Sequence, residues 1–298
     1  MPYGAEAIAE AVRLILAGQP VAVATETVYG LAADATNAEA VARIYAAKGR
    51  PSFNPLIVHV ADLAEAQKLG TFDKSALALA AAHWPGPLTV VVPLRPDSGV
   101  ASLVTAGLTS IALRVPAHPA MQALLAACAR PLAAPSANAS GRISPTRAAH
   151  VVASLGDRIA LVIDSGATER GIESTIIAAT GGPVRLLRRG PIEIDAAASL
   201  SQAIEAPGQL ASHYAPQKPL RLEVTEARAD EYLIGYGPVT GDVTLSATGN
   251  PVEAATRLFD LLHQADTSYH PSIAVAPIPG PAIAAALRDR LYRAAAPR

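Results

Sequence analysis

The chain has 298 residues, 51% of them hydrophobic, which is enough to bury a large core and to form one large domain or two. Its 24 Lys and Arg residues nearly balance its 25 Asp and Glu residues, which excludes a general positive field that would hold a nucleic acid by charge alone, so any such contact must be local. A single cysteine, Cys128, excludes an internal disulfide framework and a multi-cysteine zinc site, and fits a reducing compartment.

The N-terminus and the apolar runs predict a soluble cytoplasmic protein with no membrane contact. Residues 1–6 lack the basic segment followed by an apolar run that marks a secretory signal. Runs such as 76–82 are far shorter than the ~20 residues that span a membrane. Cys128 follows the apolar residues 124–127, so we expect a buried, inert thiol on a helix rather than a nucleophile.

Helical and extended patterns alternate over the first two thirds of the chain, which is typical of an α/β fold. A first helix, with apolar residues from Ile8 to Leu16, ends at Gly18, and a second begins after Asn37 and ends near Gly49. Further helices are expected at 74–83, 119–129 and 146–155. Strands are expected at 21–24, 56–60, 88–92, 111–115, 131–134, 160–163, 175–178 and 184–187.

Periodicity disappears between Ala206 and Pro219, where prolines and a glycine accumulate, so this segment is expected to be an ordered but irregular linker. Beyond it, strands at 232–236 and 272–276 and helices at 252–264 and 282–294 predict a second, smaller α/β unit. We therefore divide the chain into a larger first domain of residues 1–205, a linker of residues 206–219 and a C-terminal domain of residues 220–298.

The chain lacks a P-loop and a GxGxxG motif after the first strand, so a nucleotide would have to be held in another way. One candidate is the segment 48–55, in which Lys48 and Arg50 flank a glycine and can present an ammonium and a guanidinium to adjacent phosphate oxygens. The alternative is a helix C-terminus whose cations only complement the helix dipole. Spacing alone does not separate the two.

The other candidate is the segment 135–146, a loop of small hydroxyl and amide residues between a strand and a helix. Such a loop leaves backbone N–H groups free for an anion or a ribose. The alternative is a polar turn in which Ser144 is an ordinary helix N-cap before Pro145.

Three further segments begin or end predicted strands, where α/β proteins bind ligands: 25–30, 110–114 and 171–175. Arg114 lies in an otherwise apolar strand, where a charge is costly unless an anionic ligand or a carboxylate meets it, and we favour the ligand. His59 also lies inside a strand and on spacing alone is more often structural. Glu26 could pair with Lys48 or Arg50 or help to bind magnesium, and the sequence does not decide.

Together these segments resemble the YrdC-like threonylcarbamoyl-AMP synthase family. The motifs that carry the resemblance occur in the family's order: T-E-T-V-Y-G-L at 25–31, K-G-R-P-x-x-N-P-L-I-V-H-V at 48–60, P-S-A-N-x-S-G at 135–141, E-S-T-I at 173–176 and R-x-G at 188–190. The string S-H-Y-A-P at 212–216, followed by a small α/β unit, resembles the two-domain form. The resemblance implies a twisted mixed sheet with flanking helices, followed by a smaller Rossmann-like α/β domain.

The resemblance also implies a cavity that holds ATP and L-threonine side by side, with Lys48 and Arg50 as the catalytic pair. The residues implied for ATP are Lys48, Arg50, Asn54, Ser110, Ser136, Asn138, Ser144, Arg188, Ser212 and Tyr214. Those implied for threonine are Thr27, His59, Arg114, the Ala134 backbone and Ser174. No residue is assigned as a metal ligand, and Mg²⁺ is expected to arrive with ATP.

The expected reaction joins ATP, L-threonine and bicarbonate into L-threonylcarbamoyl-AMP with release of pyrophosphate, as the first step of threonylcarbamoyladenosine formation in tRNA. Expected partners are downstream tRNA threonylcarbamoyl transferase proteins and, weakly, tRNA itself. Two alternatives stay open: an RNA-binding module of the same fold without synthase activity, and a carbamoyltransferase-type domain. The near-neutral charge disfavours the first, and the single cysteine disfavours the second because that domain usually accompanies zinc-finger cysteines.

Overall fold

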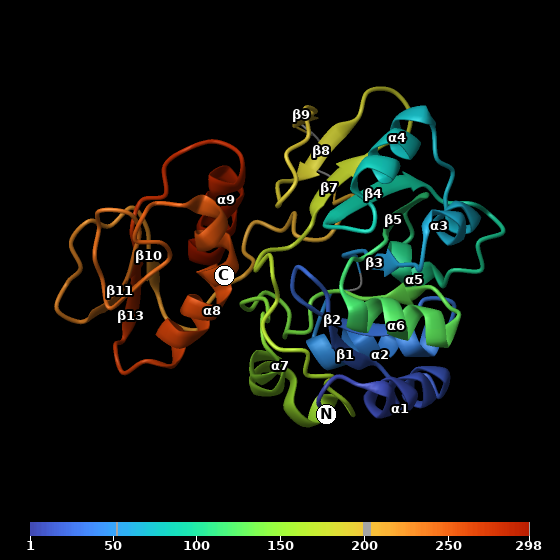
Figure 1. The fold of residues 1–298 in the computed structure, drawn as a ribbon, viewed down its shortest axis with the longest axis horizontal. Coiled ribbons are helices and arrows are strands. Elements are labelled where there is room, and N and C mark those ends of the chain that lie inside the picture. The colour runs from blue at the N-terminus through green and yellow to red at the C-terminus, as the bar shows by residue number, and fades with distance from the viewer. Residues whose placement is uncertain (52, 199–203, 298) are drawn as a thin grey trace.

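The structure is a computed structural model that describes residues 1–51, 53–198 and 204–297. A twisted nine-stranded mixed sheet dominates its first two thirds, with strand order β1-β2-β6-β3-β5-β4-β7-β8-β9 (Figure 1). The strands are β1 (Val21–Ala24), β2 (Tyr29–Asp34), β3 (Ile57–His59), β4 (Leu88–Pro93), β5 (Ser110–Arg114), β6 (Leu132–Ala133), β7 (Thr175–Ala178), β8 (Arg185–Arg188) and β9 (Ala197–Ala198). The pairs β3–β5, β4–β7 and β8–β9 are parallel, and the remaining neighbours are antiparallel.

Helices cover both faces of this sheet, and alternate residues of one strand point to different helices. Val21 and Val23 pack with α1 and α6, whereas Ala22 and Ala24 belong to the larger core on the other side. That larger core includes residues of α2, α3, α4, α5 and α7. The helices are α1 (Ala5–Leu16), α2 (Ala38–Lys48), α3 (Leu63–Leu69), α4 (Lys74–His83), α5 (Ser102–Thr105), α6 (Pro119–Cys128) and α7 (Ala148–Leu155), with a 3₁₀ turn at Gly156–Arg158.

A second sheet lies in the C-terminal part, on the left in Figure 1. Its four strands are all parallel, in the order β10-β13-β11-β12. They are β10 (Leu220–Arg221), β11 (Glu231–Gly235), β12 (Val243–Thr244) and β13 (Ser272–Val275), and two helices pack on them, α8 (Pro251–Thr267) and α9 (Ile283–Ala295). This parallel α/β unit has a core of its own, centred on residues such as Ile234, Phe259 and Leu287.

The predicted ends of α2 are confirmed. The side chain of Asn37 accepts hydrogen bonds from the backbone N–H groups of Glu39 and Ala40, and Gly49 ends the helix with a left-handed φ of 59°. This turn directs the chain from Lys48 toward Arg50. The prediction for Cys128 is also confirmed, since the residue is buried on α6 and burial raises the pKa of its thiol to about 11.

Other sequence predictions are wrong. The strand expected at 160–163 forms only isolated bridges, one of them between Val162 and Ala22. Strand β2 was not predicted, because its six residues are all buried and show no alternation. The short helices α3 and α5 were also not predicted.

The two α/β units contact each other beyond the connecting segment. The imidazoles of His150 on α7 and His263 on α8 stack with centroids 3.9 Å apart, and Arg147 forms an ion pair with Asp260 at 2.7 Å. A Cβ atom added to Gly171 would lie 2.2 Å from the carbonyl oxygen of Ala255 on α8, so the two backbones meet closely there. Among the described residues, no helix combines the length and apolar character required to cross a bilayer.

Candidate active site

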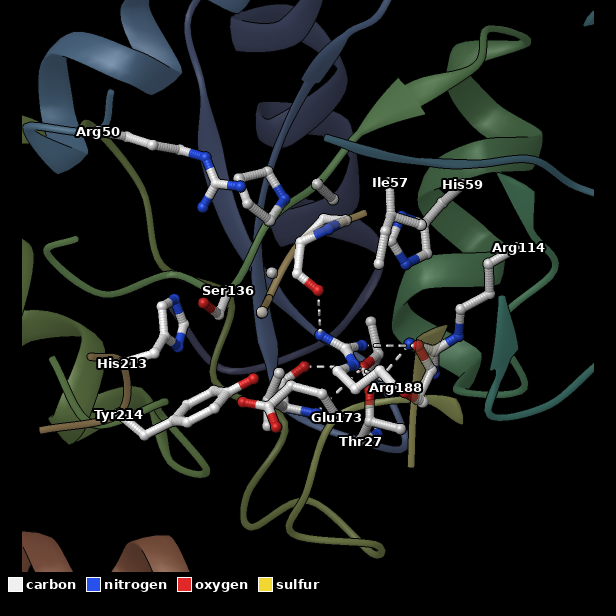
Figure 2. Close-up of a pocket in the computed structure, with 18 residues that line it drawn as sticks. Thr27, Arg50, Ile57, His59, Arg114, Ser136, Glu173, Arg188, His213 and Tyr214 are labelled. Atoms are coloured by element: carbon white, nitrogen blue, oxygen red, sulfur yellow. Dashed lines mark hydrogen bonds between the residues drawn. The ribbon is translucent and has the colours of Figure 1, made fainter. Parts of the chain in front are cut away.

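A pocket opens over the ends of the central strands, walled on one side by the segment that leads to the second sheet (Figure 2). Its lining comprises Thr25, Thr27, Val28, Gly30, Arg50, Ile57, His59, Arg114, Ala134, Pro135, Ser136, Glu173, Ser174, Arg188, Pro207, Gly208, His213 and Tyr214. In Figure 2, Arg50 and the His213–Tyr214 pair lie on one side of the pocket, and His59 and Arg114 lie on the other. The cavity has a volume of about 50 Å³, below the ~300–1,000 Å³ of typical ligand pockets.

Arg50 is held by two backbone oxygens and by the neighbouring Tyr45 hydroxyl. Its Nε donates to the Asn54 carbonyl at 3.2 Å and its Nη2 to the Pro55 carbonyl at 2.9 Å. Burial lowers the pKa of Arg50 to about 10, so the guanidinium is cationic at neutral pH but has lost most of its water. A desolvated cation without an ion-pair partner among the described residues is a strong site for an anion.

Arg188, the last residue of β8, lies on the same pocket. Its Nε and Nη2 donate to the backbone and hydroxyl oxygens of Ser174, each at 3.0 Å, and its Nη1 donates to the Pro207 carbonyl at 3.4 Å. The Ser174 hydroxyl also pairs with that of Thr89 at 2.7 Å. Burial lowers the pKa of Arg188. A second buried guanidinium is thereby fixed by neutral oxygens.

Arg114, at the end of β5, forms an ion pair with Glu26 at 2.6 Å. It also donates to the hydroxyl of Thr27 at 2.9 Å and to the Gly86 carbonyl at 3.2 Å. Burial would raise the pKa of Glu26, but the charge and hydrogen bond of Arg114 and backbone donors lower it below its usual value. From the sequence pattern we favoured an anionic ligand over a carboxylate as the partner of Arg114. In the structure, the carboxylate of Glu26 is that partner. These bonds use three of five guanidinium N–H groups, which leaves two for a ligand.

His59 lies beside Arg114, because β3 and β5 are parallel and the two residues are register partners. Burial, with the charge of Arg114, lowers the pKa of His59 to about 3, so the ring is neutral at physiological pH. Both ring nitrogens are buried without a partner among the described residues. Buried polar atoms are rarely left unpaired, which marks this position for a polar ligand.

Lys48 lies behind the pocket rather than on its lining. Its ammonium donates to the carbonyls of Ser136 (2.5 Å) and Asn138, so it holds the loop that carries the lining residues Pro135 and Ser136. Burial, followed by the charges of Arg50 and Arg158, places the pKa of Lys48 well below its usual value. The Lys48 ammonium therefore binds carbonyl groups of another loop and not those at the end of its own helix.

Five other residues expected at the nucleotide also lie off the lining, namely Asn54, Ser110, Asn138, Ser144 and Ser212. The Asn54 side chain is buried with both amide atoms unpartnered among the described residues. The Asn138 amide donates to the carbonyls of Ala139 and Arg142 within its own loop. Ser110 begins β5, and the Ser212 hydroxyl donates to the Ala296 carbonyl at 3.4 Å.

Ser144 does not line the pocket but is hydrogen-bonded to Glu173, which does. Its hydroxyl donates to Glu173 Oε1, whereas Arg290 Nε on α9 donates to Glu173 Oε2 at 2.9 Å. Ser144 is not a helix cap, since α7 begins after Arg147. The resemblance did not single out Arg290, and no local signal in the sequence does so, because its partner lies 117 residues earlier.

His213 and Tyr214 form the wall contributed by the linker. The rings pack edge to face with centroids 4.1 Å apart, and Tyr214 has a positive φ of 62°. The Tyr214 hydroxyl and His213 Nδ1 are buried without partners among the described residues. Burial and then the charge of Arg50 keep the pKa of His213 well below its usual value.

A metal has no ready site in the protein itself. Nowhere in residues 1–51, 53–198 and 204–297 do three His, Cys, Asp or Glu side chains gather closely enough to hold an ion. The two carboxylates nearest the ligand side, Glu26 and Glu173, are each bound by an arginine. The residues present therefore do not fit a metal held by the protein alone.

Comparison with known proteins adds to this geometry. The family model of Sua5, YciO and YrdC, described as telomere recombination, matches residues 13–190, and a model of the threonylcarbamoyl-AMP synthase C-terminal domain matches residues 168–296. A threonylcarbamoyl-AMP synthase of Bacillus subtilis is 37% identical over 98% of this chain and 93% of that protein. One of Pyrococcus abyssi is 42% identical over 67% of this chain and 62% of that protein.

A crystal structure of Pyrococcus abyssi Sua5 in complex with L-threonine superimposes with a TM-score of 0.88 at 34% identity, covering 97% of this chain and 94% of that one. Both α/β units are therefore included in the likeness. With family models matched along most of its length and a relative similar from end to end, the chain belongs to the Sua5/YrdC family of threonylcarbamoyl-AMP synthases, in its two-domain form.

Proposed function

We propose that the protein makes L-threonylcarbamoyl-AMP and pyrophosphate from ATP, L-threonine and bicarbonate, the first step of N6-threonylcarbamoyladenosine formation in tRNA. The observation that carries this proposal is the convergence of three buried arginines, Arg50, Arg114 and Arg188, on one pocket, in a chain whose relatives are named for that activity. Such a pocket suits a substrate set with both a triphosphate and a carboxylate.

The threonine end of the pocket lies around Arg114 in this proposal. The two free N–H groups of Arg114 bind the carboxylate of L-threonine, and the Glu26 ion pair and Thr27 fix the plane of the guanidinium. His59, Ser174 and the Ala134 backbone surround the amino acid. A neutral His59 can accept or donate one hydrogen bond without repelling the ammonium group.

The nucleotide end lies between Arg50, Arg188 and the linker wall. Arg50 and Arg188 bind phosphate oxygens and stabilise the charge that builds on them as pyrophosphate leaves. Lys48 supports this end by holding the loop that contains Ser136, and it reaches a phosphate only if it releases a carbonyl. Asn54, Ser110, Asn138 and Ser212 stay assigned to the nucleotide as part of the proposal, together with the linker residue Tyr214.

The chemistry needs no nucleophile from the protein. The amine of L-threonine attacks the carbon of bicarbonate, water leaves, and the product is N-carboxy-threonine. An oxygen of this carbamate attacks the α-phosphorus of ATP, and the bond to the β-phosphate oxygen breaks to release pyrophosphate. The protein acts as a nucleotidyltransferase by aligning the two substrates and excluding water from an unstable carbamate.

Magnesium is expected to be bound by the phosphates of ATP, where it would offset their charge. No step depends on a metal held by the protein, since Glu26 and Glu173 are both engaged. We also assign the protein to the cytoplasm, where its unstable product passes to tRNA threonylcarbamoyl transferase proteins and contact with tRNA itself is weak.

The direct test is to incubate the purified chain with ATP, bicarbonate and L-threonine and to detect threonylcarbamoyl-AMP and pyrophosphate by mass spectrometry. Omission of either threonine or bicarbonate should abolish both products. Formation of a carbamoylated adenylate only when carbamoyl phosphate is supplied would instead support the carbamoyltransferase alternative. Tight, steeply salt-dependent tRNA binding without any product would support the RNA-binding alternative.

A further inference from the structure

Helix α9 of the C-terminal unit reaches the pocket through one side chain, that of Arg290. This side chain has no exposed surface, although it comes from a different sheet layer than the rest of the site. Its Nε donates to Glu173 Oε2 at 2.9 Å, its Nη2 to the Arg189 carbonyl at 2.9 Å, and its Nη1 to Asp289 at 2.9 Å. The Arg290 side chain thus forms hydrogen bonds with residues of both α/β units.

Glu173 is the only acidic side chain among the described residues that line the pocket. Both of its carboxylate oxygens are occupied, one by the Ser144 hydroxyl and the other by Arg290. Arg290 is the one cation paired with it in the described part of the chain. Without that partner, a buried negative charge would line the same pocket as Arg50 and Arg188 and would repel phosphate oxygens.

The same helix also holds the linker wall. The Arg290 guanidinium lies 5.2 Å from the centre of the Tyr214 ring, within the range of a cation–π contact. One turn further along α9, Arg293 accepts a hydrogen bond from the His213 N–H at 3.1 Å through its carbonyl and donates to the Leu210 carbonyl at 2.5 Å. Arg290 therefore contacts both Glu173 and Tyr214, two lining residues that lie beside each other in the pocket (Figure 2).

We propose that Arg290 is a positioning residue through which docking of the C-terminal unit sets the affinity of the pocket for ATP: it neutralises Glu173 and fixes Tyr214 in the linker wall. This inference rests on the proposed function in placing the nucleotide in this pocket. L-threonine binding, which is assigned to the opposite end around Arg114, should depend much less on Arg290.

The test measures calorimetric affinities for a non-hydrolysable ATP analogue and for L-threonine separately in the full chain. Arg290→Met should weaken ATP-analogue binding at least tenfold and leave threonine binding within about twofold. The double variant Arg290→Met with Glu173→Gln should recover most of the ATP affinity, because the uncompensated charge is gone. Arg288→Met is the matched control, since Arg288 is on the same helix but donates only to the Ile278 carbonyl within its own unit.

Rescue by Glu173→Gln is the readout that a merely structural role would not produce. Equal ATP affinity in Arg290→Met and wild type, or no recovery in the double variant, would overturn the proposal. If Arg290→Met does not fold, Arg290→Lys and the double variant make the same distinction, since loss of ATP affinity in both would contradict charge compensation. A wild-type chain that binds neither ligand would instead refute the proposed function.

Discussion

Arg114 lines the pocket and forms an ion pair with Glu26 at 2.6 Å, with side chains only 4% and 3% exposed. The pair stabilises a charge that would otherwise be costly in an apolar strand, because each charged group replaces the water that the other loses on burial. It also leaves part of the guanidinium free for an anionic ligand, so that the same residue is both stabilised and available.

Loss of the Glu26 charge should destabilise the fold. Glu26→Gln leaves Arg114 buried without its counterion, and the free energy of unfolding should fall by about 3 kcal/mol in denaturant titrations at neutral pH. Asp97→Asn is the control, because its ion pair with Arg95 is exposed and should contribute no more than about 1 kcal/mol. Similar losses in the two variants would contradict the role given to the buried pair.

The stabilisation from Glu26 should also depend on pH in a defined direction. Its folded-state pKa lies below the ordinary value of 4.5, so its contribution is complete above about pH 4.5 and is lost as the pH falls through the folded-state pKa. Wild type should therefore lose more stability than Glu26→Gln below pH 4.5. Parallel stability curves for the two proteins would refute this assignment.

His59 should make the stability of the fold depend on pH over a higher range than Glu26 does. The unfolded chain binds a proton near pH 6.5 that the folded chain takes up only near pH 3, so stability decreases as the pH falls from about 6.5 toward 3. His59→Asn should remove up to about 1.4 kcal/mol per pH unit of that slope in urea unfolding between pH 6 and pH 4. An unchanged slope would show that His59 is already protonated in the folded state.

Arg50 should matter for turnover more than for folding. Its partners are neutral groups, two backbone carbonyls and the Tyr45 hydroxyl, so Arg50→Ala should reduce kcat/KM for ATP by about 100-fold or more and change the thermal midpoint by only about 4 °C or less. Arg43→Ala offers a control on the preceding helix α2, since Arg43 also donates to a backbone carbonyl, that of Gly18, but does not line the pocket. Unchanged product formation in Arg50→Ala would exclude Arg50 from the phosphate site.

Gly171 should limit how the two units pack. Gly171→Ala would place a Cβ 2.2 Å from the Ala255 carbonyl and would also strain a φ of +69°, so it should lower both the thermal midpoint and ATP affinity. Gly166→Ala has a similar φ of +80° with nothing within 4 Å of the new Cβ, which separates backbone strain from the clash. An equal effect of the two substitutions would mean that contact with α8 is unimportant.

Local signals were sufficient for much of the fold. The limits of β1, β7 and α4 agree with the sequence predictions, and the Asn37 and Gly49 caps of α2 are where their side-chain chemistry places them. Strand β2 escaped prediction because burial on both faces removes the alternation that reveals a strand. The apolar run at 160–163 misled because it pairs with β1 only around Ala22, over too short a stretch to form a strand.

The site was predictable where a single residue conflicted with its surroundings. Arg114 stands out as a charge in an apolar strand, whereas His59 was assigned to the site by the family resemblance and not by its spacing. The structure brings both to the pocket. The ion-pair partners of such residues are harder to predict from the sequence, because the Glu26–Arg114 and Glu173–Arg290 pairs join residues 88 and 117 positions apart. Such pairs depend on how strands and domains dock, which neither periodicity nor motif spacing encodes.

The central claim is that one pocket binds the triphosphate through Arg50 and Arg188 and the amino acid through Arg114. A crystal structure of the chain with a non-hydrolysable ATP analogue and L-threonine tests it most directly. We predict that the threonine carboxylate lies within hydrogen-bond distance of Arg114, with phosphate oxygens on Arg50 and Arg188. Ligands bound elsewhere, or a pocket in which these arginines contact neither ligand, would contradict the account.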